Sequence, residues 1–173
     1  MKTKLAFTLI LIFGILITGC KQEEQKIEVE EVKIDLINDA FPEAKQEVKK
    51  TMDSIAKSAQ DGNIDKLISF HAYSPKFTEF KDGQPRNDGE ANEKYERHVF
   101  GSVSEILKFD MNDMKIAVYG DVANVTLHTD FHLKFGEDLV VVNEQMTLLL
   151  VKTKTGWRIV HEHHSPLKKE ENE

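Results

Sequence analysis

The chain has 173 residues and a formal net charge of −7 at pH 7, because 30 acidic residues outnumber 23 basic ones. An acidic surface repels nucleic acid and anionic lipid headgroups, so no nucleic acid is expected as a partner. The chain holds a single cysteine, Cys20, so no disulfide can form within it and the fold must depend on a hydrophobic core.

Residues 1–19 are expected to be a lipoprotein signal peptide. Lys2 and Lys4 precede an apolar run over residues 5–17, which is shorter than the roughly 20 residues that a membrane-spanning helix needs. The run leads into Thr18-Gly19-Cys20, which resembles the lipobox of bacterial lipoproteins, with Cys20 as the lipidated first residue. The alternative is an ordinary secretory signal that happens to contain a cysteine.

Lipidation of Cys20 would anchor the chain to the lipid bilayer of a bacterial cell envelope, on its extracytoplasmic side. In a Gram-negative cell the outer membrane is expected, because Lys21 stands where many inner-membrane lipoproteins carry Asp, and surface exposure stays open. Removal of residues 1–19 removes two lysines and no acids, so the net charge changes from −7 to −9.

The remaining chain divides into three parts. Residues 20–38 are expected to form a polar tether, although the partly alternating stretch 27–36 could add an edge strand. Residues 39–167 have the length of one domain. Residues 168–173 are expected to be a disordered acidic tail.

Three helices are expected in the first half of this domain. Apolar residues recur at three- and four-residue spacing over residues 44–59, between a proline and a glycine that suit helix ends. Asn63 can cap a second, short helix over residues 64–68, and Asp88 can cap a third. A short strand is expected within residues 71–80.

From Phe109 onward the apolar period changes to two, which is typical of antiparallel strands. Turns at Gly120-Asp121, Gly136-Glu137 and Lys154–Gly156 separate four strands. The sequence therefore predicts an α+β fold, in which a curved antiparallel sheet carries the three N-terminal helices on its concave face.

The register of these strands predicts a polar patch on the inner face. A two-residue loop at Gly136-Glu137 pairs Phe135 with Asp138, and a two-residue loop at the next turn continues the same rule into the last strand. Trp157 and Ile159 then extend the core, and the residues that follow at the same spacing are polar. The predicted patch comprises Thr129, Glu144, His161, His163 and Ser165.

This patch, beside aromatic walls, predicts a pocket for a small, partly apolar ligand, with no cofactor. His163 or His161 beside Glu144 could alternatively act as a general base, which would make the protein an enzyme. His71, Tyr73 and Asp130 could contribute to that chemistry. The residues expected to contact the ligand are Tyr73, Phe77, Phe80, Thr129, Glu144, Trp157, His161, His163 and Ser165.

A metal site is a further interpretation of the same histidines. His161 and His163 lie two residues apart on one face of a strand, and Glu144 could add a third ligand for zinc or iron. Hydrogen bonding of two neutral imidazoles at the pocket mouth accounts for the same residues, and no metal is expected.

The order of elements resembles the SnoaL-like branch of the nuclear transport factor 2-like (NTF2-like) superfamily. The resemblance rests on the segments Asp61–Leu67 and Tyr119–Ala123 and on Gly156–Ser165, which is also similar to the association domain of calcium/calmodulin-dependent kinase II. It spans roughly residues 43–166 and implies a cone-shaped fold. It leaves the activity open, because this superfamily includes isomerases, dehydratases, hydrolases and non-catalytic binding or assembly domains.

The resemblance also implies a homodimer formed through the outer sheet face. An apolar stripe on that face, of Val141, Leu149, Val151 and Val160, suits self-association, although β-branched residues also simply favour strands. The leading hypothesis is a lipid-anchored, extracytoplasmic domain that binds a small, partly apolar ligand without catalysis. An isomerase, dehydratase or hydrolase and an assembly or scaffold module are the alternatives.

Overall fold

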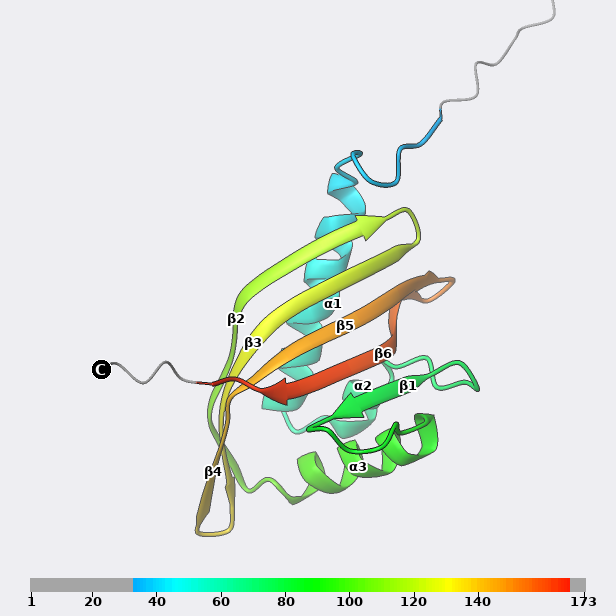
Figure 1. Cartoon of the computed structure of the whole chain (residues 1–173). Helices are drawn as coiled ribbons and strands as arrows, with labels where there is room; N and C mark the ends of the chain where they lie inside the picture. Colours follow the sequence, from blue (N-terminus) through cyan, green and yellow to red (C-terminus); the bar gives the residue numbers. More distant parts are fainter. Residues whose placement is uncertain (1–32, 169–173) are drawn as a thin grey trace, which may run out of the picture. The chain divides into compact units, whose positions relative to one another are not determined.

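The computed structural model describes residues 33–168, so the signal peptide, Cys20, most of the tether and the end of the tail lie outside the described residues. Residues 33–36 form no strand, and the rest of the possible edge strand lies outside the described part. Within the described chain, no helix combines the length and apolarity needed to cross a membrane. The elements (Figure 1) are α1 (Pro42–Gln60), α2 (Ile64–Ile68), β1 (Thr78–Lys81), α3 (Gly89–Ser102), β2 (Glu105–Tyr119), β3 (Val122–Phe135), β4 (Asp138–Val142), β5 (Glu144–Thr153) and β6 (Gly156–Pro166).

The three predicted helices are confirmed, together with two predicted caps. The Asn63 side chain accepts a hydrogen bond from the Lys66 backbone N–H at 3.1 Å, and the Asp88 side chain accepts one from the Ala91 backbone N–H at 3.0 Å. Each bond satisfies a donor that the first helical turn would otherwise leave unpaired. Local sequence therefore sets where α2 and α3 begin.

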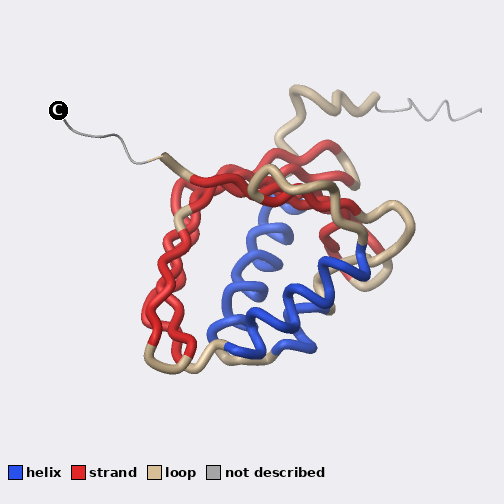
Figure 2. The backbone as a smooth tube through the Cα atoms, turned by 60° about the horizontal axis from the view of Figure 1, so that its bottom comes forward, coloured by secondary structure: helices blue, strands red, loops and turns tan. Residues whose placement is uncertain are grey.

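The strands form one six-stranded sheet in the order β1-β6-β5-β3-β2, with β4 paired to the far end of β3. Figure 2 shows that the sheet is strongly curved and that the helices lie on its concave side. The predicted α+β fold is thus confirmed. The sheet is not wholly antiparallel, however, because β1 pairs in parallel with β6. The single long strand expected after Gly136-Glu137 is divided at Asn143 into β4 and β5.

The register predicted around the β3–β4 turn is also confirmed. Phe135 pairs with Asp138, and farther along β3 Val125 pairs with Leu148 of β5. A core forms where these inner faces meet α1, whose Val48 and Met52 are completely buried. The core consists of Val48, Met52, Phe77, Val118, Ala123, Val125, Leu127, Leu148, Leu150, Trp157 and Ile159.

The predicted facing of the second half of β6 is wrong. Leu150 pairs with Ile159 but Leu149 pairs with His161, so Val160 is an extra residue in β6. Such a bulge reverses the alternation of all residues that follow it. Glu162 and His164 therefore face the helices and are buried, whereas His161 and His163 lie on the outer face.

Candidate functional site

A cavity of about 210 Å³ lies between the helices and the inner face of the sheet. Most of its wall is apolar, and its polar groups come mainly from α3, β5 and the part of β6 beyond the bulge. The lining consists of Met52, Ile55, Leu67, His71, Lys81, Asp82, Tyr95, Glu96, Val99, Phe100, Phe109, Met111, Phe131, Leu133, Val142, Glu144, Met146, Leu148, Ile159, Glu162 and His164.

Glu162 is the centre of the first hydrogen-bond network at the polar end. One carboxylate oxygen lies 2.9 Å from Nε2 of His71, and the other accepts a bond from the Asn92 side-chain amide at 3.1 Å. Asn92, which is completely buried, in turn accepts a bond from the Tyr73 hydroxyl at 2.7 Å. The network ties the loop after α2, helix α3 and strand β6 together around one buried carboxylate.

Glu144 and His164 form the second polar pair. Nδ1 of His164 lies 3.0 Å from Oε2 of Glu144, and the Lys81 ammonium donates to the other Glu144 oxygen at 3.3 Å. Thr129 positions Glu144, because its hydroxyl oxygen accepts a hydrogen bond from the Glu144 backbone N–H at 2.9 Å. The pair brings β1, β3, β5 and β6 together at the end of the cavity.

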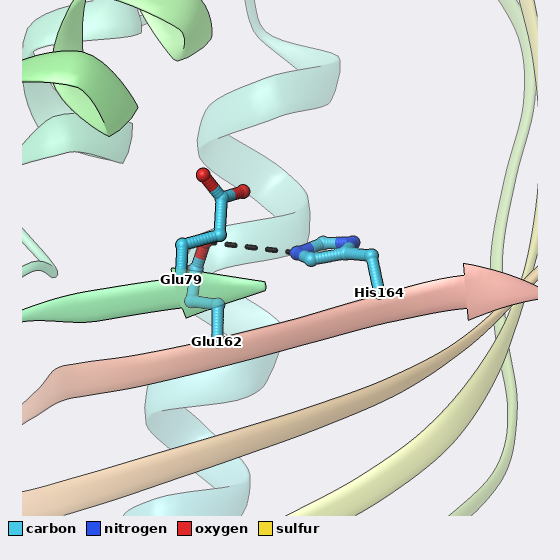
Figure 3. Close-up of side chains that lie close together, drawn as sticks. All are labelled: Glu79, Glu162 and His164. Atoms are coloured by element: carbon cyan, nitrogen blue, oxygen red, sulfur yellow. Dashed lines mark ion pairs between the residues drawn. The ribbon is translucent and has the colours of Figure 1, made fainter. Parts of the chain in front are cut away.

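Glu79, Glu162 and His164 are the one group of potential metal ligands with close donor atoms within the described residues (Figure 3). Their donor atoms all lie within 4.8 Å of one another, and all three residues are buried. The metal ligands considered from sequence, His161 and His163 with Glu144, are not brought together. Nδ1 of His161 is instead 2.8 Å from the Thr78 hydroxyl oxygen.

The sequence of residues 48–168 matches the model of a SnoaL-like domain, which covers most of the chain. The chain belongs to the SnoaL-like domain family. No curated protein is similar enough in sequence to count as a relative.

Solved structures similar to this SnoaL-like domain share its fold at low sequence identity. A candidate dehydratase of the NTF2-like family from Streptomyces avermitilis is 18% identical with a TM-score of 0.66, covering 75% of this chain and 100% of its own. An NTF2-like superfamily protein from Salmonella enterica is 22% identical with a TM-score of 0.63, covering 78% and 99%. A candidate calcium/calmodulin-dependent kinase II association domain from Exiguobacterium sibiricum is 14% identical with a TM-score of 0.61, covering 77% and 98%. Both resemblances inferred from the sequence are confirmed at the level of the fold.

The buried acidic and basic groups of the SnoaL-like domain change one another's pKa values. Burial raises the pKa of Glu96 to about 7, and the negative charge of Glu162 adds to this rise. Burial would lower the pKa of His164, but its interactions with Glu144 and Glu162 outweigh burial and raise the pKa to about 9. Burial would raise the pKa of Glu162, but His164 and His71 hold it well below its usual range. The raised pKa of Glu96 lies close to neutral pH, where a carboxyl can either donate or accept a proton.

Of the residues predicted to contact a ligand, Glu144 lines the cavity. Tyr73 and Thr129 lie behind the lining and position other residues through hydrogen bonds. Phe77 and Trp157 are core residues, each 2% exposed, and the Trp157 indole N–H donates to the Glu47 carboxylate at 3.0 Å. The aromatic walls predicted from sequence are thus mostly part of the core.

The Val160 bulge places His161, His163 and Ser165 on the outer face, and Phe80 of β1 lies beside the two histidines. The Phe80 ring is 6.1 Å from the His161 ring and 6.4 Å from the His163 ring, and Phe80 is 46% exposed. Ser165 pairs with Gln145, whose side of β5 also faces outward. These residues do not meet Glu144 at the cavity.

The sequence interpretation missed Glu96, Glu162, Lys81 and His164 as cavity residues. Part of the signal was present in α3, where Asn92, Glu96 and Phe100 recur every four residues and share one helix face. Polar residues at two of these three positions indicate that this face of α3 lines a polar cavity instead of packing in the hydrophobic core. Nothing in the sequence of β6 marks Val160 as a bulge.

Proposed function

We propose that the cavity binds a small, mostly apolar molecule that carries one hydroxyl or amino group. The observation that supports this best is Glu96, which lines the cavity and has no hydrogen-bond partner among residues 33–168. Two other cavity carboxylates, Glu144 and Glu162, already accept bonds from protein donors, and Asp82 at the cavity edge is exposed to water. A donor on a ligand would satisfy Glu96 and leave the ligand's apolar part against the methionine and phenylalanine side chains.

The cavity volume limits the size of this molecule. A cavity of about 150 Å³ lined by apolar side chains holds benzene, and the cavity here measures about 210 Å³. One ring or a short branched chain with a few substituent atoms fits this space. A nucleotide, a peptide or a lipid with a full-length chain would extend beyond this volume.

A panel of monocyclic phenols, aromatic amines and small terpenoid alcohols tests the proposal through ligand-dependent melting shifts. Hits should raise the melting temperature of the wild type and do so much less in Glu96→Gln. The matched control is Glu90→Gln, a change of an exposed residue in the first turn of the same helix, which should keep the full shift. A panel without hits would contradict the proposed binding. Hits that raise the melting temperature equally in Glu96→Gln and Glu90→Gln would contradict the role of Glu96.

Acid–base catalysis is a second candidate function, of the isomerase, dehydratase or hydrolase type. It is favoured by the pKa of Glu96, about 7, because a general base works best when its pKa lies near the working pH. Glu96 takes the role predicted for His161 or His163, which lie outside the cavity. The Streptomyces neighbour named a candidate dehydratase is consistent with such chemistry. Each hit should then be converted by the wild type but not by Glu96→Gln. If the wild type leaves every hit unchanged, only the binding function remains supported.

Lipid anchoring through Cys20 remains a proposal that rests on the lipobox-like sequence. An anchored domain of this kind would meet its ligand outside the cytoplasm. Cys20→Ser should abolish acylation and move the protein from the membrane fraction to the soluble fraction. Unchanged membrane partition of this variant would contradict the proposal.

A homodimer through the outer sheet face is the remaining proposal on partners. It is supported by the apolar stripe on that face, of which Val141 is 46% exposed. Val141→Lys should shift the protein to a monomer in analytical ultracentrifugation. Glu137→Lys, in the exposed turn beside β4, is the control for added charge. A wild type that is monomeric at high protein concentration would refute the dimer.

A further inference from the structure

Two strands bring three potential metal ligands together at the polar end of the cavity. β1 runs parallel to β6 and places Glu79 directly opposite Glu162. His164 follows Glu162 by two residues, so its ring lies on the same face of β6. Figure 3 shows the three side chains close together on the same side of these two strands, with the His164 ring pointing toward Glu162.

Two of the donor atoms in this group make no hydrogen bond within residues 33–168. Both Oε1 of Glu79 and Nε2 of His164 are buried, and the nearest charged group to Nε2 is Oε2 of Glu162 at 3.6 Å, beyond hydrogen-bond distance. Glu79 is 1% exposed and His164 is 6% exposed. An unsatisfied buried polar atom costs about 1–3 kcal/mol and more when it is charged, so such atoms are rare unless they bind something. Their position therefore points to a ligand between them.

The other atoms of the three residues are held in place by neighbours. Nδ1 of His164 bonds to the Glu144 carboxylate at 3.0 Å, and Oε2 of Glu79 accepts a bond from the Asn87 amide at 2.9 Å. A carboxylate on one ring nitrogen fixes the tautomer of a histidine and leaves the other nitrogen for a metal, which is the usual arrangement around metal-binding histidines. Glu162 is oriented in the same way by its hydrogen bonds to His71 and Asn92.

We propose that Glu79, Glu162 and His164 bind one divalent transition-metal ion, with Zn²⁺ as the best match. One imidazole and two carboxylates suit zinc better than calcium or magnesium, which prefer six or more oxygen ligands. Tetrahedral zinc with bonds of about 2.0–2.2 Å places its ligand atoms about 3.3–3.6 Å apart. Nε2 of His164 is already 3.6 Å from Oε2 of Glu162, so a small movement of the Glu79 side chain completes the site.

The proposed ion would have an open position toward the cavity. Glu162 and His164 line the cavity, whereas Glu79 lies behind them. Three protein ligands and a fourth position open to water or substrate are typical of catalytic rather than structural zinc sites. The charges also fit, because two carboxylates and a neutral imidazole balance one Zn²⁺. The site does not depend on the small molecule proposed above, since it can be tested with the metal alone.

Metal titration of the full-length chain tests the site. The protein is purified in detergent, treated with a chelator, freed from it and titrated with Zn²⁺ by calorimetry. We expect saturation at one equivalent in the wild type, and affinity reduced at least about tenfold in Glu79→Gln and His164→Gln. His163→Gln is the matched control, since His163 is the adjacent residue, is exposed and faces outward. It should bind zinc as tightly as the wild type.

Cobalt gives a second readout that needs no variant to fold. Co²⁺ added to the metal-free wild type should produce visible absorption bands of a four- or five-coordinate site, and one equivalent of Zn²⁺ should bleach them. Absence of these bands, or of saturable zinc binding, would overturn the proposal. Zinc binding that is lost in His163→Gln, or that is unchanged in both Glu79→Gln and His164→Gln, would place the metal elsewhere and overturn it as well.

Discussion

Replacement of Glu96 by Gln should make the protein more stable at neutral and alkaline pH. In the folded chain the pKa of Glu96 is raised from 4.5 to about 7, first by burial and then by the charge of Glu162. A carboxyl whose pKa is higher in the folded than in the unfolded state opposes folding once it ionises. The wild type should therefore lose stability as the pH rises from about 4.5 to about 7, and Glu96→Gln should not show this loss.

The size of the effect follows from the same shift. The interval between 4.5 and about 7 corresponds to a free energy on the order of 3 kcal/mol, at 1.36 kcal/mol for each pH unit. At pH 8 the free energy of unfolding of Glu96→Gln should exceed that of the wild type by about this amount. Near pH 4.5 the two proteins should be about equally stable. This is a large share of the 5–15 kcal/mol that typically stabilises a domain, so ordinary denaturant unfolding can resolve it.

Urea unfolding followed by circular dichroism at pH 4.5, 6, 7 and 8 measures the difference. Glu90→Gln is the matched control on the same helix, and it should lower stability slightly at pH 6 and above because a negative charge in the first helical turn favours the helix. The reasoning is refuted if Glu96→Gln is less stable than the wild type at pH 8, or if the difference between them is the same at every pH.

Three further predictions concern the core, a helix cap and the facing of β6. Trp157→Ala should lower the free energy of unfolding by about 3–5 kcal/mol in urea titrations, because the indole is 2% exposed in a core without disulfides; a loss below 1 kcal/mol would contradict its core role. Asp88→Ala should cost about 1 kcal/mol by removing the α3 cap, and Glu137→Ala in the exposed turn between β3 and β4 should cost much less by the same assay. Diethylpyrocarbonate should modify the exposed His163 much faster than the buried His164, and mass spectrometry showing the reverse order would mean that the facing of β6 is wrong.

Features that depend on local sequence could be predicted. The caps at Asn63 and Asp88 act on backbone N–H groups three residues away, and the two-residue loop at Gly136-Glu137 fixes the pairing of the strands it joins. These constraints need no knowledge of the rest of the chain. They were sufficient for the helices, for the inner face of β3 and for the fold class.

The site could not be predicted because it depends on contacts between distant segments. β1 and β6 are separated by more than 70 residues, and their parallel pairing is what places Glu79 beside Glu162. The bulge at Val160 occurs where the chain around His71 also pairs with Ile159, so β6 must fit two neighbours at once. Regular alternation was therefore the wrong assumption after Ile159, and a single extra residue exchanged the predicted histidines for Glu162 and His164.

The most direct test of the proposed function is a crystal structure of the protein with a hit from the small-molecule panel. We predict that the molecule occupies the cavity beneath the sheet, with its hydroxyl or amino group within hydrogen-bond distance of the Glu96 carboxyl. Its apolar part should contact Met146 and Phe131, which line the cavity wall. A molecule bound instead on the outer face beside His161 and His163, with the cavity filled only by water, would contradict the account.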